Sequence, residues 1–171
     1  MLGIDVRIRR RLEGMALYAY NGEDRFPLRT EHLDMAEAPV PFGRYKLLNL
    51  LGEGGMAKVY RAILSGPMGF EKEVALKRLD SKVTADERVV KALINEARLG
   101  GQLKHKNIIE IYEFNQVNGH YFMAMEYVDG WTLGALVRRC RNRREYLPSS
   151  VVYEVIANIC KGLEYAHALQ D

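Results

Sequence analysis

A glycine-rich run and a lysine beyond it are the residues whose types and spacing suggest chemistry. The run reads Leu-Gly-Glu-Gly-Gly-Met-Ala-Lys-Val over residues 51–59, and Lys77 lies eighteen residues after Val59 in a second apolar stretch. Glycine has no Cβ, so such a run can bend tightly and approach a phosphate closely. The Lys77 ammonium is a compact charge that can reach the same phosphate. The pattern therefore predicts a site for a nucleotide phosphate.

Two other interpretations fit the glycine run on its own. Gly52, Gly54 and Ala57 also satisfy G-x-G-x-x-G/A, the dinucleotide-binding fingerprint, which requires a strand before the run and a helix after it. A plain structural turn is the second alternative. Dinucleotide-binding domains alternate strands with helices, and the elements expected downstream do not alternate in that way. The dinucleotide interpretation is therefore less favoured.

Apolar periodicity and turn residues predict the elements that must position these residues. Strands over 45–51 and 59–64 enter and leave the glycine run, and a third over 74–79 carries Lys77. A hairpin turn at Asn118-Gly119 joins two later strands. The remaining expected elements are a helix beginning at Thr84, strands over 108–114 and 120–127, and helices over 132–142 and 149–170.

The first and last helices have apolar residues at helical spacing, which predicts one packed face on each. The first begins with Thr84-Ala85-Asp86-Glu87, which fits a capping box, and Glu87 can pair with Lys91 one turn later. Its apolar stripe is Val90, Leu93, Ile94 and Ala97, and that of the last helix is Val152, Val155, Ile156, Ile159, Leu163 and Ala166.

Composition and charge restrict the class of protein. The 171 residues are 48% hydrophobic and 27% charged, as in soluble globular proteins. No stretch is long and apolar enough to span a membrane, and the N-terminus lacks the apolar core of a signal peptide. Cys140 and Cys160 are too few and too far apart for a disulfide or metal framework. We therefore expect a cytoplasmic protein with no membrane segment.

A run of five arginines over 138–144 raises the alternative of nucleic-acid binding. The overall net charge is only +3, and no aromatic residue is interleaved with the run as a stacking platform. We therefore expect a solvated basic helix face and no nucleic-acid partner. The arginines are Arg138, Arg139, Arg141, Arg143 and Arg144.

Four motifs in order resemble those of protein kinases, and in detail those of bacterial serine/threonine kinases. The glycine run and the Val-Ala-Leu-Lys at 74–77 resemble G-x-G-x-x-G-x-V and V-A-I-K, with Ala57 in place of the third glycine. Glu96 lies nineteen residues after Lys77 in the first helix. The stretch 103–109 resembles L-x-H-x-N-I-V, where His105 is expected to stabilise a turn. Residues 123–130 resemble the hinge that receives adenine.

The resemblance implies an α+β fold with a protein-kinase-like amino-terminal lobe. That lobe would be a five-stranded antiparallel sheet with one packed helix, followed by two helices of an incomplete carboxy-terminal lobe. The implied organisation is a loosely ordered extension over 1–41, the amino-terminal lobe over 42–128, and the start of the second lobe over 129–171. Gly100 and Gly101 depart from the expected pattern, because neither offers a side chain to pack against the sheet.

The resemblance also implies ATP as the ligand, with catalytic roles for Lys77 and Glu96. In the family this glutamate holds the strand lysine against the α and β phosphates. Apolar residues would sandwich adenine, Met125 would close the back of the pocket, and Glu126 and Val128 would offer a carbonyl and an amide. The implied nucleotide-binding residues are Leu51, Gly52, Glu53, Gly54, Gly55, Met56, Ala57, Lys58, Val59, Ala75, Lys77, Met125, Glu126 and Val128.

The family's H-R-D catalytic loop and D-F-G metal site do not occur in this sequence. We therefore expect no metal ligands on this chain, magnesium only in a complete kinase, and no phosphoryl transfer by these residues alone. The expected function is the ATP-binding portion of a kinase that modifies protein serine or threonine. The alternative is a non-catalytic, pseudokinase-like binding module. We also expect self-association through an exposed helix 149–170.

Overall fold

The computed structural model describes residues 7–8, 38–80 and 87–169, which form two compact units. The first contains residues 38–80, 87–104 and 109–127, and the second contains 7–8, 105–108 and 128–169. The expected capping box at Thr84 and most of the expected loose extension over 1–41 lie outside the described residues.

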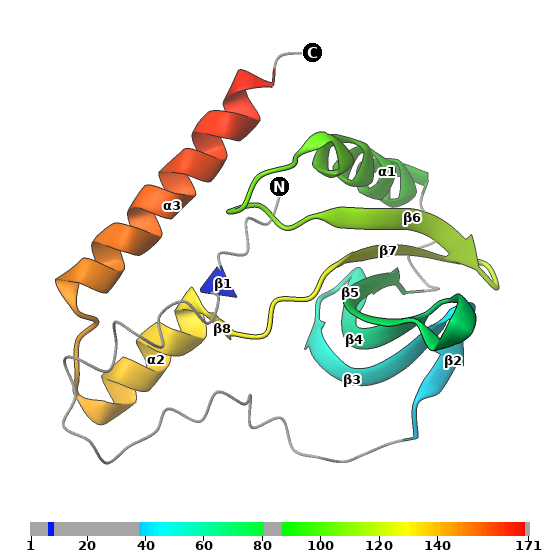
Figure 1. The fold of residues 1–171 in the computed structure, drawn as a ribbon, viewed down its shortest axis with the longest axis horizontal. Coiled ribbons are helices and arrows are strands. Elements are labelled where there is room, and N and C mark those ends of the chain that lie inside the picture. The colour runs from blue at the N-terminus through cyan, green and yellow to red at the C-terminus, as the bar shows by residue number, and fades with distance from the viewer. Residues whose placement is uncertain (1–6, 9–37, 81–86, 170–171) are drawn as a thin grey trace. The chain divides into compact units, whose positions relative to one another are not determined.

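One antiparallel sheet forms the body of the first unit (Figure 1). The five expected strands are present, and the short strand β2 adds a sixth at one edge. Proline has no backbone N–H to donate to a neighbouring strand, so Pro41 is tolerated in this edge strand. The order across the sheet is β2-β3-β4-β5-β7-β6. The bounds are β2 (Val40–Phe42), β3 (Tyr45–Glu53), β4 (Ala57–Ser65), β5 (Glu71–Leu79), β6 (Ile111–Val117) and β7 (His120–Glu126).

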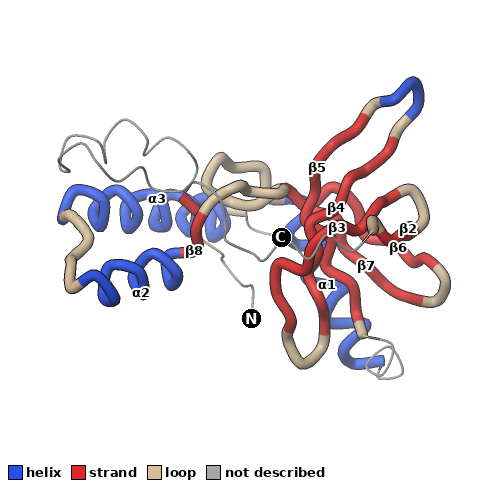
Figure 2. Tube along the Cα trace, turned by 90° about the horizontal axis from the view of Figure 1, so that it is seen from below, coloured by secondary structure: helices blue, strands red, loops and turns tan. Residues whose placement is uncertain are grey.

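Tight turns connect neighbouring strands. The β6–β7 turn is at Asn118 and Gly119, whose φ angles of 49° and 79° suit the two-residue hairpin predicted from their types. The β4–β5 hairpin is longer and ends in the single 3-10 turn η3 (Pro67–Gly69), visible at its tip in Figure 2. The β4–β5 hairpin places Val59 opposite Lys77, and the pairing of β5 with β7 places Lys77 opposite Met123.

Helix α1 (Glu87–Gln102) packs on one face of this sheet. Leu93 and Ala97 are buried there against Leu79 and Met123, as their spacing predicted. The expected stripe is wrong at Ile94, which is 41% exposed. The buried residues of α1 are Leu93, Ala97 and Gly100, which follow one another at helical spacing.

A second apolar cluster lies on the opposite face of the sheet. Phe122 is at its centre, with the rings of Phe42 and Tyr45 packed edge-on at centroid distances of 5.4 Å. The Tyr45 hydroxyl donates a hydrogen bond to the Glu113 carboxylate on β6, and Arg44 Nη2 lies 2.5 Å from the same oxygen. Strand β6 is at one edge of the sheet, and Tyr45 is on β3, next to the strand at the other edge. These contacts therefore show that the sheet curls strongly.

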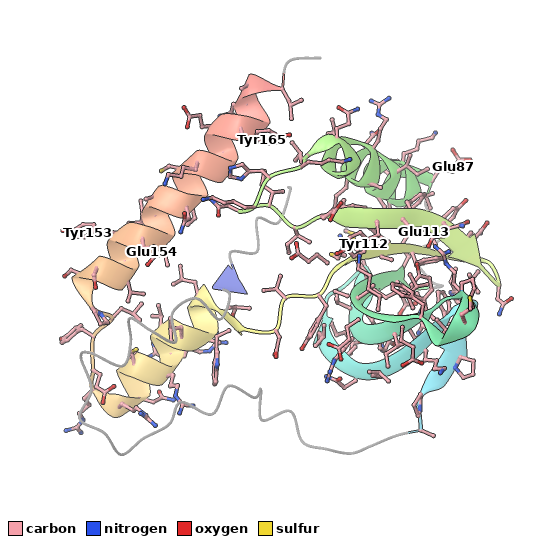
Figure 3. The ribbon with its side chains drawn as sticks, viewed as in Figure 1. Glu87, Tyr112, Glu113, Tyr153, Glu154 and Tyr165 are labelled. Carbon is pink, nitrogen blue, oxygen red and sulfur yellow. The ribbon has the colours of Figure 1, made fainter. Side chains whose placement is uncertain are left out.

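A bulge in β6 allows Glu113 to make these contacts. Ile111 pairs with Met125 and Glu113 pairs with Ala124, so Tyr112 is an extra residue in β6. Figure 3 labels Tyr112 and Glu113, which follow each other in the chain. Tyr112 packs against the cluster around Phe122, while Ile111 packs against the cluster beneath α1. The bulge therefore places the consecutive residues Tyr112 and Glu113 on the same face of the sheet, the face of the Phe122 cluster.

The second unit is built from helices α2 (Leu133–Arg143) and α3 (Ser149–Ala168). Strand β1 (Arg7–Ile8) pairs with β8 (Trp131–Thr132), a pairing that the sequence did not predict. The Thr132 side chain caps α2 by accepting a hydrogen bond from the Ala135 amide at 3.1 Å. No helix in the described part of the chain has the length and apolar character needed to cross a membrane.

The expected apolar face of α3 is divided between buried and exposed positions. Val151, Val155 and Gly162 are buried, whereas Val152 and Ile156 are 37% and 52% exposed. Residues 105–108 contact α3 through the side-chain amide of Asn107, whose Nδ2 donates a hydrogen bond to the Asn158 backbone carbonyl at 2.9 Å. His105 accepts a hydrogen bond from the Asn107 N–H and stacks on Tyr165, which confirms a turn-stabilising role.

Candidate nucleotide-binding site

The centre of the candidate site is an ion pair between strand β5 and helix α1. Lys77 Nζ lies 3.0 Å from each of the two carboxylate oxygens of Glu96. The two side chains are 26% and 33% exposed, so the pair is shielded but still reaches solvent. The structure thus brings together two residues nineteen positions apart in the sequence, as predicted. An ammonium held in this way is oriented and remains accessible to a third, anionic group.

Cross-strand pairing builds an apolar surface around Lys77. Val59 on β4 and Met123 on β7 are its direct partners, and Ala75 pairs with Met125 one step along. Directly paired residues of an antiparallel sheet share a face, so these side chains lie on the α1 side with Lys77. Ala75 is 2% and Met123 1% exposed. The sequence analysis missed Met123, although its alternation with Met125 along β7 signals a shared face.

The glycine run forms the turn between β3 and β4. The Gly54 amide donates to the Ala57 carbonyl at 2.9 Å, and Glu53 pairs with Lys58 at 2.9 Å across the base of the turn. The Glu53 carboxylate also raises the pKa of Lys58. The whole stretch from Gly52 to Met56 is exposed.

The glycines of this turn are not required by backbone conformation. Gly52, Gly54 and Gly55 are absent from the described residues with positive φ, so the turn does not use the left-handed backbone conformation at these positions. A Cβ at Gly52 or Gly55 would have no described atom within 4 Å. What these glycines provide is open space beside the backbone, which is what close approach of a phosphate requires.

The expected hinge residues divide between the two units. Met125 and Glu126 end strand β7, where the Glu126 amide donates to the Glu110 carbonyl at 2.8 Å. Leu51 is half-buried in β3 beside the glycine turn. Val128 is 8% exposed and belongs to the other unit, so its expected contact with the same ligand stays a prediction.

The residues of the candidate site fit a nucleoside triphosphate better than they fit a metal ion. Lys77 offers a positive charge, the glycine turn offers uncovered backbone, and Ala75 and Val59 offer apolar surface. No group of three metal-ligating side chains gathers among the described residues, so we name no magnesium ligand on this chain. A separate cavity of about 320 Å³ is lined by Arg44, Glu113 and Phe122 among others and contains none of the predicted site residues.

Comparison with known proteins identifies the family. Residues 45–170 match the family model described as the protein kinase domain. The chain belongs to the protein kinase family. The matched range includes the glycine turn, the Lys77–Glu96 pair and the strand that ends in Glu126.

Two kinases of the bacterium Myxococcus xanthus are among the relatives of this chain. The chain is 38% identical to tyrosine-protein kinase MasK of Myxococcus xanthus over 127 residues, which are 74% of this chain and 20% of that protein. It is 34% identical to serine/threonine-protein kinase pkn3 of the same species over 125 residues, 72% of this chain and 22% of that protein. The chain therefore spans about a fifth of the length of these relatives.

Solved structures show the same fold. The kinase domain of PknI from Mycobacterium tuberculosis superposes with a TM-score of 0.60 and 28% sequence identity, covering 77% of this chain and 51% of that one. The kinase-like fold expected from the sequence, with a curled antiparallel sheet followed by helices, is therefore confirmed.

Proposed function

We propose that this chain is the ATP-binding portion of a protein kinase that transfers phosphate to serine or threonine. The observation that carries the proposal is the bidentate contact of Lys77 with Glu96 at 3.0 Å. In kinases this pair must be in place for the lysine to hold the α and β phosphates. The relatives named as serine/threonine kinases support the residue preference, whereas MasK carries a tyrosine-kinase name.

Each predicted residue has a role that its place in the fold supports. Lys77 neutralises charge on the phosphates, and Glu96 keeps its ammonium directed toward them. The backbone of the turn at 52–57 lies over the phosphates, and Gly52 and Gly55 leave open space there, because a Cβ at either would meet no described atom within 4 Å. Val59 and Ala75 provide the apolar surface for adenine, and Met125 closes it. The Glu126 carbonyl hydrogen-bonds the edge of the base, and the contact of the Val128 amide with the same base stays a prediction.

Binding and transfer are separate parts of the proposal. The sequence contains neither H-R-D nor D-F-G, so it supplies no residue for the catalytic base or for the magnesium ions that neutralise charge in transfer. These residues alone are therefore expected to bind ATP weakly, with little dependence on magnesium. Protein substrate and magnesium belong to the complete kinase. We place it in the cytoplasm, where free cysteines such as Cys140 and Cys160 persist.

Calorimetric titration with ATP, with and without magnesium, tests this function. ATP should bind, and Lys77→Ala should weaken the binding by about tenfold or more, the order expected for a lost charge-assisted contact. Lys72→Ala is the matched control, because Lys72 is a β5 lysine that lies over the Tyr112 ring instead of Glu96. Tighter binding of NADH than of ATP would overturn the proposal in favour of a dinucleotide site, and no nucleotide binding would favour a non-catalytic module.

A further inference from the structure

A small cavity at one end of the sheet has three basic side chains in its lining. Its volume is about 150 Å³, and it is lined by Lys58, Arg78, Leu79, Asp80 and His120. The basic residues come from three neighbouring strands, Lys58 from β4, Arg78 from β5 and His120 from β7. All five lining residues belong to the first unit, so this cavity is formed within one compact body.

The basic residues of this cavity lie on the face of the sheet opposite Lys77. Lys58 pairs directly with Arg78, and Arg78 with Phe122, so these side chains share the face of the Phe122 cluster. His120 is two residues before Phe122 on β7 and therefore points to the same face. Lys77 precedes Arg78 on β5, and successive side chains of a strand point to opposite faces. The sheet thus separates this cavity from the Lys77 ammonium.

Arg78 is a half-buried cation with no carboxylate partner among the described residues. Its guanidinium lies over the rings of Phe42 and Tyr60, with centroids 5.8 and 5.2 Å away, and Nη2 donates to the Tyr60 hydroxyl at 3.2 Å. These contacts orient the group and use one of its five N–H donors. Arginines that leave the solvent are mostly paired with an acid, as Lys58 is with Glu53 at 2.9 Å. Arg78 therefore has donors left for an anion.

His120 adds a further N–H group to the same cavity. Its Nδ1 is buried and has no hydrogen-bond partner among the described residues. In a neutral imidazole one nitrogen carries the proton and the other accepts hydrogen bonds. Buried N–H groups without an acceptor are rarer than buried acceptors without a donor, so we assign the proton to Nε2. The Nε2–H group is then the donor that His120 offers to a ligand.

The carboxylates near this cavity act on Lys58. Glu53 pairs with Lys58 and raises its pKa, and the charge of Asp80 adds a smaller effect in the same direction. These two negative charges offset the Lys58 ammonium, so Arg78 supplies the attraction for an anion. Asp80 lines the cavity and opposes that attraction. Binding of an anion is therefore expected to be weak, and to depend on Arg78 and Asp80 in opposite directions.

We propose that this cavity is an anion site that takes the phosphate group of a small molecule, separately from the proposed ATP site. Arg78 and His120 donate hydrogen bonds to the phosphate oxygens. A phosphate suits donors from different strands because it has three acceptor oxygens, whereas a carboxylate has two. The volume of about 150 Å³ is below the roughly 300–1,000 Å³ of pockets that enclose drug-sized ligands, so the cavity admits one such group and not a whole nucleotide.

Neighbouring residues of β5 provide a matched pair of variants. Arg78→Met removes the guanidinium but keeps an unbranched side chain over the two rings, whereas Lys77→Ala removes the charge on the other face. His120→Leu removes the ring donor, and Asp80→Asn removes the opposing charge. Calorimetry of the full chain measures the affinity for inorganic phosphate at constant ionic strength. The shift in melting temperature that phosphate causes is measured for each variant against its own value without phosphate.

Phosphate should bind the unchanged chain and Lys77→Ala with the same affinity and raise the melting temperature of both. Arg78→Met should bind about tenfold more weakly, as expected when a charge-assisted hydrogen bond is lost, and His120→Leu several-fold more weakly. Asp80→Asn should bind several-fold more tightly, because a repelling charge is gone. The proposal is overturned if the unchanged chain binds no phosphate, or if Lys77→Ala loses the binding and Arg78→Met keeps it.

Two further comparisons complete the test. If Arg78→Met does not fold, His120→Leu and Asp80→Asn decide: opposite changes in phosphate affinity support the site, and no change in either overturns it. Glycerol phosphate is titrated in parallel with inorganic phosphate. Tighter binding of glycerol phosphate would identify a phosphomonoester as the ligand, whereas tighter binding of inorganic phosphate would identify the free ion. Neither result depends on whether the chain binds ATP.

Discussion

Lys77 Nζ is equidistant from the two carboxylate oxygens of Glu96, 3.0 Å from each. The lysine is on β5 and the glutamate on α1, so the pair joins the sheet to its only packed helix in the described part of the first unit. Because both side chains keep about a quarter to a third of their surface in solvent, the pair contributes little to stability, on the order of 1 kcal/mol or less. Its main consequence is orientation of the ammonium.

Glu96→Gln should therefore weaken ATP binding far more than it destabilises the fold. The amide keeps the shape of the carboxylate but loses the charge that holds Lys77, and we expect about a tenfold loss of affinity with less than about 1 kcal/mol lost in stability. Calorimetry and urea unfolding measure the two quantities. Glu87→Gln is the control, since Glu87 pairs with Lys91 on the exposed face of the same helix. Equal effects of the two substitutions on ATP binding would contradict the assigned role.

Gly55→Ala should separate ligand binding from folding in the glycine turn. Gly55 has no positive φ and no described atom near its would-be Cβ, so alanine should leave the melting temperature unchanged or slightly higher. The added methyl would stand where the backbone is proposed to approach phosphate, so ATP affinity should fall several-fold. Thermal unfolding and calorimetry on the same sample test this. A large loss of stability would show that the glycine is needed by the fold itself.

The Tyr45–Glu113 contact predicts a loss of stability at alkaline pH. Burial of Tyr45, together with the hydrogen bond to Glu113, raises its pKa to about 12 from the usual value of 10. The folded state thus holds this proton more tightly than the unfolded state, so the stabilisation is full below pH 10 and is lost as pH rises toward 12. Tyr45→Phe should cost about 1.5–3 kcal/mol at neutral pH, as for a hydrogen bond to a charged group.

The difference in unfolding free energy between the unchanged chain and Tyr45→Phe measures this effect, because other titrating groups are common to both. The difference should shrink between pH 10 and 12. Glu113 gives the acidic counterpart: burial opposes its ionisation, but hydrogen bonds from Tyr45, Asn115 and Arg44 outweigh it and lower the pKa. Its stabilisation is present above its usual pKa of 4.5 and is lost as pH falls. If the difference in unfolding free energy between the unchanged chain and Tyr45→Phe did not change with pH, the contact between Tyr45 and Glu113 would not form in solution.

Helix α3 is expected to mediate self-association. Val152 and Ile156 are exposed one turn apart, and Tyr153 beside them is 71% exposed. Leaving aliphatic side chains in water forgoes roughly 1.5–3 kcal/mol each when fully exposed. Light scattering should show oligomers, and Ile156→Lys should reduce them, while Glu154→Lys on the same helix should not. A monodisperse monomer for the unchanged chain would contradict this expectation.

The sequence by itself determined the elements of the sheet and the motifs of the site. Alternating apolar residues, the Asn118-Gly119 turn and the glycine run predicted five strands in their order along the chain, because these signals are local. The spacing of Lys77 and Glu96 predicted their pairing only through resemblance to kinases. The apolar periodicity predicted that Lys77 lies in a strand and Glu96 in a helix, but it did not predict that the two side chains contact each other.

Only the tertiary structure decided how closely the elements pack and which faces they present. Local pattern favoured Ile94 as a packed residue of α1, but Ile94 is 41% exposed in the structure, whereas Gly100 is buried with Leu93 and Ala97. The extra residue Tyr112 in β6 likewise changed which side chains share a face, and so placed Glu113 against Tyr45. Such contacts join residues about 70 positions apart in the chain, and they depend on the curl of the whole sheet, which no local pattern records.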